Sequence, residues 1–60
     1  GKSNKIIIKD GCWIGANVTI MPGVTIGQGC IIGSNSLVIS DTEPNSLYVG
    51  QPAKKLKNVR

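Results

Sequence analysis

The fold is decided by the stretch IGANVTIMPGVTIG, residues 14–27. Its pattern recurs every six residues and extends over six repeats, from Ile8 to about Glu43. The first position of each repeat is aliphatic and β-branched: Ile8, Ile14, Ile20, Ile26, Ile32 and Val38. The fifth position is small or β-branched: Cys12, Val18, Val24, Cys30, Ser36 and Thr42. A six-residue period fits no helix, so the pattern indicates short extended segments.

The fourth position of each repeat holds residues that tolerate a left-handed backbone: Gly11, Asn17, Gly23, Gly29, Asn35 and Asp41. Such residues permit sharp corners, while β-branched side chains favour extended segments that face an interior. Short strands joined by corners wind into a coil, and stacked coils pair as parallel sheets. Each coil buries its apolar side only between neighbours, so about three repeats or more are needed.

Three repeats would complete one turn of the coil, and the sequence supports this size. Residues three repeats apart keep their chemical type, as in Ile14 and Ile32, Gly15 and Gly33, Ala16 and Ser34, and Cys12 and Cys30. The sequence therefore predicts an all-β fold, a parallel β-helix of about two coils. We assign residues 1–7 to a lead-in strand of a preceding coil, 8–43 to the β-helix, and 44–60 to a C-terminal loop and short basic helix.

A chain of 60 residues forms at most one small domain, which is marginal without a staple or an oligomer. A disulfide between Cys12 and Cys30 is disfavoured because stacked side chains would point inward in parallel, so we expect two reduced, buried thiols. Two cysteines without a histidine cannot form a typical zinc shell, and no metal is expected.

The net charge of +4 is concentrated at the two ends, and no basic residue lies between Asp10 and Ala53. Nucleic-acid binding would require basic residues spread over a face with interleaved aromatics, and this pattern is absent. No segment approaches the roughly 20 apolar residues of a membrane span. The charged first ten residues do not resemble a secretory leader, so we expect a cytoplasmic protein.

The repeats and two further stretches of the sequence resemble a known family. The repeats of residues 14–27 are similar to the left-handed β-helix of hexapeptide acyltransferases, and closest to the branch that acetylates sugars, such as maltose, galactoside and lipopolysaccharide O-acetyltransferases. The stretch CWIGA, residues 12–16, resembles the family's Val-Trp-Ile-Gly stretch. The stretch GQPAK, residues 50–54, resembles its terminal Gly-Asn-Pro-Ala-Arg motif, with Gln for Asn and Lys for Arg. The resemblance runs from Ile7 to Lys57.

The resemblance implies the C-terminal part of an O-acetyltransferase that uses acetyl-coenzyme A (acetyl-CoA) as co-substrate and a sugar or polysaccharide hydroxyl as acceptor. It also implies a homotrimer with active sites between neighbouring coils. The family's general base is a histidine N-terminal to the Trp motif, and this chain has no histidine. Its carboxylates, Asp10, Asp41 and Glu43, are better interpreted as corner and loop residues. The alternatives are a serine or N-acetyltransferase of the same superfamily and a non-catalytic structural module.

Two small residues, Ala16 and Ser34, follow a repeat glycine one coil apart. The resemblance assigns them to positions whose backbone meets acetyl-CoA, although plain corner packing would explain them too. Ser40 lies where the family often has Lys or Thr near the cofactor, so Ser departs from the commoner pattern. Trp13 occupies the last position of its repeat and should point outward, with Ile31 stacked one coil later. We expect a neighbouring subunit to cover Trp13 near the active site, because large exposed apolar surface is uncommon without a partner.

The phosphate end of CoA requires positive charge. Lys54 and Lys57 match the family's basic residues after the Pro-Ala motif, although a merely solubilising tail is the alternative. Pro52 suits the first turn of a short helix, on which Lys54 and Lys57 would share one face and Lys55 would point elsewhere.

Other β-helix proteins fit the sequence less well. Ice-binding coils carry matching Thr columns, but Thr19 and Thr25 fall at different corners, and Leu37 takes the place of Thr19 three repeats later. A γ-type carbonic anhydrase needs histidine ligands for its metal. A nucleotidyltransferase domain is less well matched by the GQPAK ending.

Overall fold

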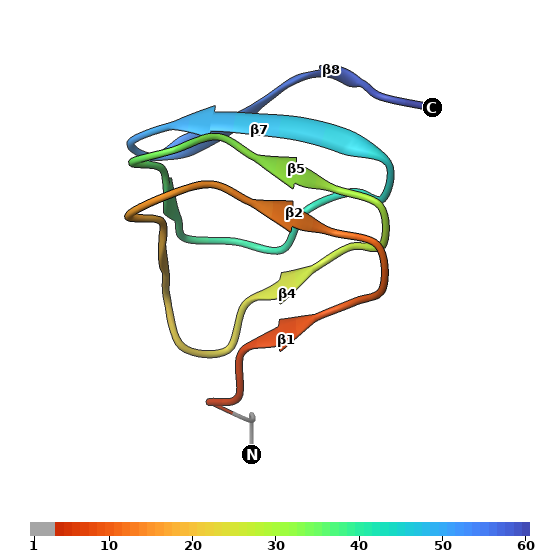
Figure 1. The fold of residues 1–60 in the computed structure, drawn as a ribbon. Helices are drawn as coiled ribbons and strands as arrows, with labels where there is room; N and C mark the ends of the chain where they lie inside the picture. The colour runs from red at the N-terminus through yellow and green to blue at the C-terminus, as the bar shows by residue number, and fades with distance from the viewer. Residues whose placement is uncertain (1–3) are drawn as a thin grey trace.

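The chain winds into stacked parallel strands, as a computed structural model shows for residues 4–60 (Figure 1). Six strands have only two residues each: β1 (Ile7–Ile8), β2 (Trp13–Ile14), β3 (Thr19–Ile20), β4 (Thr25–Ile26), β5 (Ile31–Ile32) and β6 (Leu37–Val38). Two longer strands follow, β7 (Ser46–Gly50) and β8 (Ala53–Asn58). The all-β class predicted from the repeats is confirmed.

The strand pairs have the register that the six-residue repeat predicts. Strand β1 pairs with β4, β2 with β5, and β3 with β6, all in parallel. Ile8 lies opposite Ile26, and Ile20 lies opposite Val38, so each pair joins positions three repeats apart. The predicted coil of three repeats per turn is therefore confirmed, and the fold is the left-handed parallel β-helix expected.

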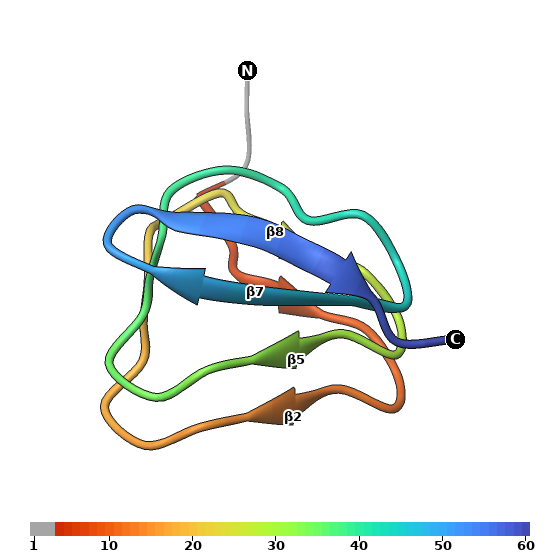
Figure 2. The same ribbon diagram turned by 90° about the horizontal axis from the view of Figure 1, so that it is seen from above.

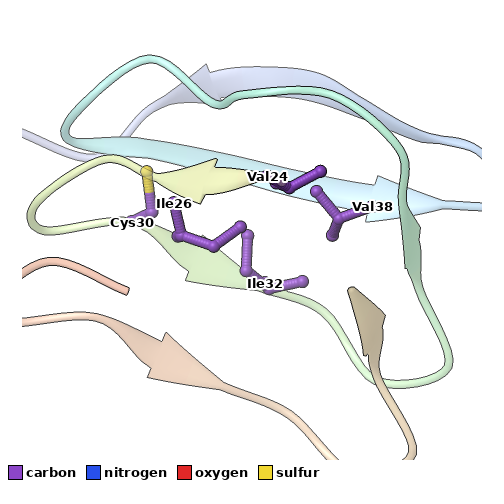
Figure 3. Close-up of a cluster of buried hydrophobic side chains, with 5 residues drawn as sticks. All are labelled: Val24, Ile26, Cys30, Ile32 and Val38. Carbon is purple, nitrogen blue, oxygen red and sulfur yellow. The ribbon is translucent and has the colours of Figure 1, made fainter. Parts of the chain in front are cut away.

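The first repeat position points into the coil, and the residue before it points outward. In β4, β5 and β6 the second residue is buried and the first is only partly so. Figure 3 shows the core where these side chains converge: Val24, Ile26, Cys30, Ile32 and Val38. Each fully buried aliphatic side chain contributes about 1.5–3 kcal/mol relative to exposure. Ile8, in the first coil, remains 49% exposed because no coil lies beneath it in the described residues.

The corners use the left-handed backbone that the fourth repeat position predicts. Positive φ angles occur at Gly11, Asn17, Gly23, Gly29 and Asn35. The sixth member of that column, Asp41, is not among the positive-φ residues of the described chain, whereas Asn45 is, with φ 54°. Asn35 is thus the last left-handed corner of the repeat column, and the next corner of this kind falls at Asn45.

The turn of the coil from β5 to β7 contains fewer residues than the turn from β2 to β5. Ile31 of β5 pairs with Leu47 of β7, and not with Val49, the residue three repeats later. In the part of the chain that the structure describes, no strand forms above β4, and side chains occupy that place. The Thr25 amide donates to Asp41 Oδ1 at 2.8 Å, and the Gly27 amide donates to Thr42 Oγ1 at 2.8 Å. The upper edge of β4 is therefore satisfied without a further strand.

The short basic helix predicted within residues 44–60 is wrong. These residues contain β7 and β8, which pair antiparallel and form a hairpin. The tip consists of Gln51 and Pro52, joined by a cis peptide bond. Helix propensity is a weak preference, and here pairing with the exposed edge of β7 prevails over it. Seen from above, β8 lies across the end of the coil, where Ala53 packs against the core (Figure 2).

Two further expectations concern the chain's beginning and its thiols. Residues 1–3 of the predicted lead-in lie outside the described residues, and Ile7 already belongs to β1. Cys12 and Cys30 are free, as expected. Cys30 is fully buried and its thiol donates to the Glu43 carbonyl at 2.9 Å, whereas Cys12 is only half-buried. The two cysteines therefore belong to the coil's interior column.

Candidate functional site

The outer face of the four-stranded sheet β2-β5-β7-β8 carries an apolar column. Trp13 lies opposite Ile31, Ile31 opposite Leu47, and Leu47 opposite Lys57. Trp13 is 62% exposed, so the predicted outward orientation and its stacking beside Ile31 are both confirmed. The column therefore begins with an indole at the first coil and ends with an ammonium group at the hairpin.

Ala16 and Ser34 meet at the corner that follows this sheet. The Ala16 amide donates to Ser34 Oγ at 3.1 Å, and the Asn35 amide donates to the Ala16 carbonyl at 2.8 Å. Ala16 and Ser34 are both exposed. A serine hydroxyl that accepts one hydrogen bond still has its own proton to donate. The corner therefore presents a polar group that a ligand could reach.

Gly15 has no predicted role, although the structure requires glycine there. A Cβ atom at Gly15 would lie 2.7 Å from both the amide nitrogen and Oγ of Ser34. Gly33, one coil above, is limited in the same way by Val49, whose Cγ1 would lie 2.7 Å from an added Cβ. The pairing of Gly15 with Gly33 in one repeat column was the available signal. Close stacking of the backbones, and not backbone flexibility, explains Gly15, whereas the neighbour of Gly33 is a side-chain methyl group.

The three lysines of β8 lie in two different environments. Lys54 is opposite Val49 and Lys57 is opposite Leu47, whereas Lys55 is opposite Tyr48. Lys55 Nζ lies 3.3 Å from Glu43 Oε1. Lys55 thus points elsewhere, as expected, and Lys54 and Lys57 share the outer face. They do so on a strand, however, and not on the helix that the sequence suggested.

Ser40 is the predicted site residue that the structure does not bring to the others. It follows β6, so β6 separates it from the Ser34 corner of the same coil. Ser40 is exposed.

One cavity of the structure is lined by other residues. This cavity of about 280 Å³ opens beside β4, and it contains none of the predicted site residues. Its lining consists of Lys9, Thr25, Gly27, Gln28, Asp41, Thr42 and Pro44. Because Asp41 and Thr42 there accept hydrogen bonds from β4, their polar atoms have a structural role.

Two carboxylates have structural roles, although Asp41 bonds the edge of β4 and does not form the corner that the sequence suggested. Asp41 accepts the Thr25 amide, and Glu43 pairs with Lys55. Within residues 4–60 no group of three or more His, Cys, Asp or Glu side chains is placed to hold a metal ion. The same residues include no helix long and apolar enough to cross a membrane. The predicted site residues offer groups for binding: amides, a hydroxyl, an indole and lysines.

Comparison with known proteins identifies the class. Residues 5–40 match the model of the bacterial transferase hexapeptide family, which describes six repeats. The match covers more than half of the chain, so the chain belongs to this hexapeptide-repeat family. The expected membership is confirmed.

Similar proteins are named as acetyltransferases. A chloramphenicol acetyltransferase of Klebsiella aerogenes is 46% identical over 56 residues, which are 93% of this chain and 27% of that protein. A hexapeptide-repeat acetyltransferase of Vibrio cholerae, solved with acetyl-CoA, superposes with a TM-score of 0.90 and is 44% identical over 92% of this chain and 30% of its own. A maltose O-acetyltransferase of Clostridium difficile 630 gives a TM-score of 0.89 and 42% identity over 92% of this chain and 29% of its own. The chain thus spans less than a third of the length of these proteins.

Proposed function

We propose that this chain forms the cofactor side of an acetyl-CoA-dependent O-acetyltransferase whose acceptor is a sugar or polysaccharide hydroxyl. One observation carries the proposal: Trp13, the Ala16–Ser34 corner and the lysine pair all lie along one sheet and the corner beside it. The solved relative from Vibrio cholerae in complex with acetyl-CoA supports it.

The residues present fit the parts of CoA. Its phosphate end is polyanionic, and lysine binds phosphate as a compact point charge. Lys54 and Lys57 provide two such charges on one face of the hairpin. The amide arm of the cofactor needs hydrogen-bond partners, and the Ser34 hydroxyl at the corner supplies one. Trp13 offers an exposed flat surface for the cofactor or for a covering subunit.

When bound, acetyl-CoA supplies an acetyl group activated as a thioester. In the proposed reaction the acceptor oxygen bonds to the acetyl carbon, the carbon–sulfur bond breaks, and the acceptor's proton passes to a general base. The chain has no histidine, and Asp41 and Glu43 are engaged in structural contacts. We therefore assign binding and orientation of the cofactor to this chain, and proton removal to a residue outside it.

The proposal includes a homotrimer in the cytoplasm. Trp13 remains 62% exposed in the single chain, and large exposed apolar side chains are usually covered by a partner. Met21 and Ile39, outside the β2-β5-β7-β8 sheet, are exposed as well and add apolar area. Ser40 would then reach a cofactor bound at a neighbouring subunit.

The acceptor is proposed from the relatives' names. One relative is named for maltose and another for chloramphenicol, so the same repeat serves different acceptors. The similarity to the maltose O-acetyltransferase supports a sugar hydroxyl as the acceptor. The alternative functions are serine or other N-acetylation and a non-catalytic structural module. Acetyl transfer by the complete protein to maltose, to serine and to an amino sugar distinguishes them, because a structural module would acetylate none.

Titration of the complete protein with acetyl-CoA tests the cofactor assignment. Each of Lys54→Ala and Lys57→Ala should weaken binding about tenfold, since a hydrogen bond to a charged group contributes about 1.5–3 kcal/mol. Lys55→Ala is the matched control, because it removes the same charge from the opposite face of β8. Equal affinity in the wild type and in both outer-face variants would refute the assignment.

A further inference from the structure

The ladder between β7 and β8 is irregular at one place. Tyr48 pairs with Lys55 and the preceding Leu47 pairs with Lys57, so Leu56 has no partner of its own across the ladder. An extra residue of this kind is a β-bulge, which shifts the side-chain alternation of everything beyond it. The bulge lies between the two lysines assigned to the outer face.

The bulge decides where Lys57 points. In a regular strand successive side chains alternate, so residues three positions apart lie on opposite faces. Lys54 and Lys57 are three apart, yet their partners Val49 and Leu47 are two apart on β7 and share a face. The additional residue, Leu56, therefore brings Lys57 to the same face as Lys54.

On the other face of the hairpin, Lys55 lies beside a carboxylate. It pairs with Tyr48, whose hydroxyl accepts the Glu43 amide at 3.0 Å, and its Nζ lies 3.3 Å from Glu43 Oε1. A carboxylate therefore balances the charge on that face. No ion pair of Lys54 or Lys57 is found within residues 4–60. The outer face thus carries two lysines without a carboxylate between them.

The spacing of these two lysines suits an anion with more than one phosphate group. Their partner residues are two positions apart along β7, which corresponds to about 7 Å. Two like charges at this separation repel each other, and a bound polyanion relieves the repulsion. Below Lys57 the column continues with Leu47, Ile31 and Trp13, so a ligand on the lysines would also contact apolar surface.

We infer that the bulge at Leu56 is a positioning element that converts Lys54 and Lys57 into one dicationic platform for the phosphate groups of CoA. The inference rests on the proposed function, which assigns CoA to this face. The Leu56 side chain is 64% exposed and lies outside the core, so its contribution is the extra residue in the backbone and not its packing.

Two variants of the complete protein separate position from charge. The exchange L56K/K57L keeps composition and net charge but places leucine opposite Leu47 and lysine at the unpaired position. It should weaken CoA binding about tenfold, as Lys57→Ala does. Deletion of Leu56 removes the bulge but leaves Lys57 next after Lys55, where a regular ladder again pairs it with Leu47. This deletion should keep CoA affinity within about twofold of the wild type.

Salt dependence provides a readout that a purely structural role would not move. Exposed charges are screened as ionic strength rises, so the affinity of the wild type and the deletion should fall more steeply with salt than that of the exchange. Leu56→Ala, which keeps the bulge, serves as control and should behave as wild type. Circular dichroism establishes that each variant is folded.

The outcomes distinguish the inference from the proposal beneath it. If neither Lys54→Ala nor Lys57→Ala changes CoA affinity, the cofactor assignment itself fails. If those two variants bind weakly but the exchange binds as tightly as wild type, the bulge inference alone is overturned. Loss of binding in a folded Leu56 deletion would overturn it as well, because Lys57 would then not keep its place by pairing with Leu47.

Discussion

The Ser34 hydroxyl accepts a hydrogen bond from the Ala16 amide at 3.1 Å, across one turn of the coil. The Asn35 amide donates to the Ala16 carbonyl at 2.8 Å, so Ala16 is bonded on both sides of its backbone to the coil above. This contact fixes the spacing of the two corners. It also requires that nothing larger than hydrogen stand at Gly15, directly before Ala16.

Gly15→Ala should therefore disturb the corner. The added Cβ would come within 2.7 Å of Ser34 backbone and hydroxyl atoms, and the coils would have to separate. We expect the free energy of unfolding to fall by about 1–3 kcal/mol, as for other overpacked sites, and acetyl-CoA binding to weaken. Urea unfolding and calorimetric titration measure the two effects. Thr19→Ala, on exposed surface and outside the proposed site, is the control. Wild-type values for Gly15→Ala would contradict the close approach.

Thr42→Val tests the side-chain cap of β4. The substitution keeps shape but removes the oxygen that accepts the buried Gly27 amide at 2.8 Å. An unsatisfied buried donor costs about 1–3 kcal/mol, and the melting temperature should fall accordingly. Thr19→Val is the matched control, because Thr19 is exposed on β3. Equal melting temperatures for the two variants would show that the Thr42 hydrogen bond does not contribute to stability.

Ile32→Ala should be among the most damaging core substitutions. Ile32 is fully buried, between the outer coils. Truncation of such a side chain leaves a cavity and costs about 2–5 kcal/mol. Ile39→Ala, at a residue that is 54% exposed, should change the free energy of unfolding by less than about 0.5 kcal/mol. Denaturant titration compares them, and a small effect at Ile32 would be inconsistent with this core.

Trp13→Ala tests the predicted subunit contact. Because the indole is 62% exposed in the single chain, its loss should change the fold little. We expect the far-ultraviolet circular dichroism spectrum of the complete protein to be retained. Sedimentation velocity should show a trimer that dissociates at higher protein concentration than the wild type. A trimer with unchanged dissociation in the variant would place the subunit contact elsewhere.

The repeat was predictable because each of its columns has a single physical requirement. Ile14, Ile20, Ile26 and Ile32 repeat an inward position, and the stacking of every third repeat follows from them. The repeat pattern ends where side-chain oxygens, and not the backbone of a further strand, accept the amides along the edge of β4. Asp41 fits the corner column by residue type, yet its carboxylate accepts the Thr25 amide. Nothing in the periodicity distinguishes an aspartate that turns a corner from one that closes an edge.

The candidate site was predicted by residue type more fully than by geometry. The outward orientation of Trp13 and the meeting of Ala16 with Ser34 follow from repeat position, and the structure shows both. The helix proposed for Lys54 and Lys57 is wrong because an open strand edge at β7 is a tertiary feature. The bulge at Leu56 has no marker in the sequence, since its residue type is ordinary for a strand.

The side-chain oxygen atoms of Asp41 and Thr42 also limit where the coil can be lengthened by design. A protein engineer could lengthen the coil by inserting whole units of three repeats before Asp41, since every edge there offers backbone groups to the next turn. A unit added after Thr42 would find the amides of Thr25 and Gly27 already taken. Extension beyond that point requires replacement of both residues, with a strand supplied in their place.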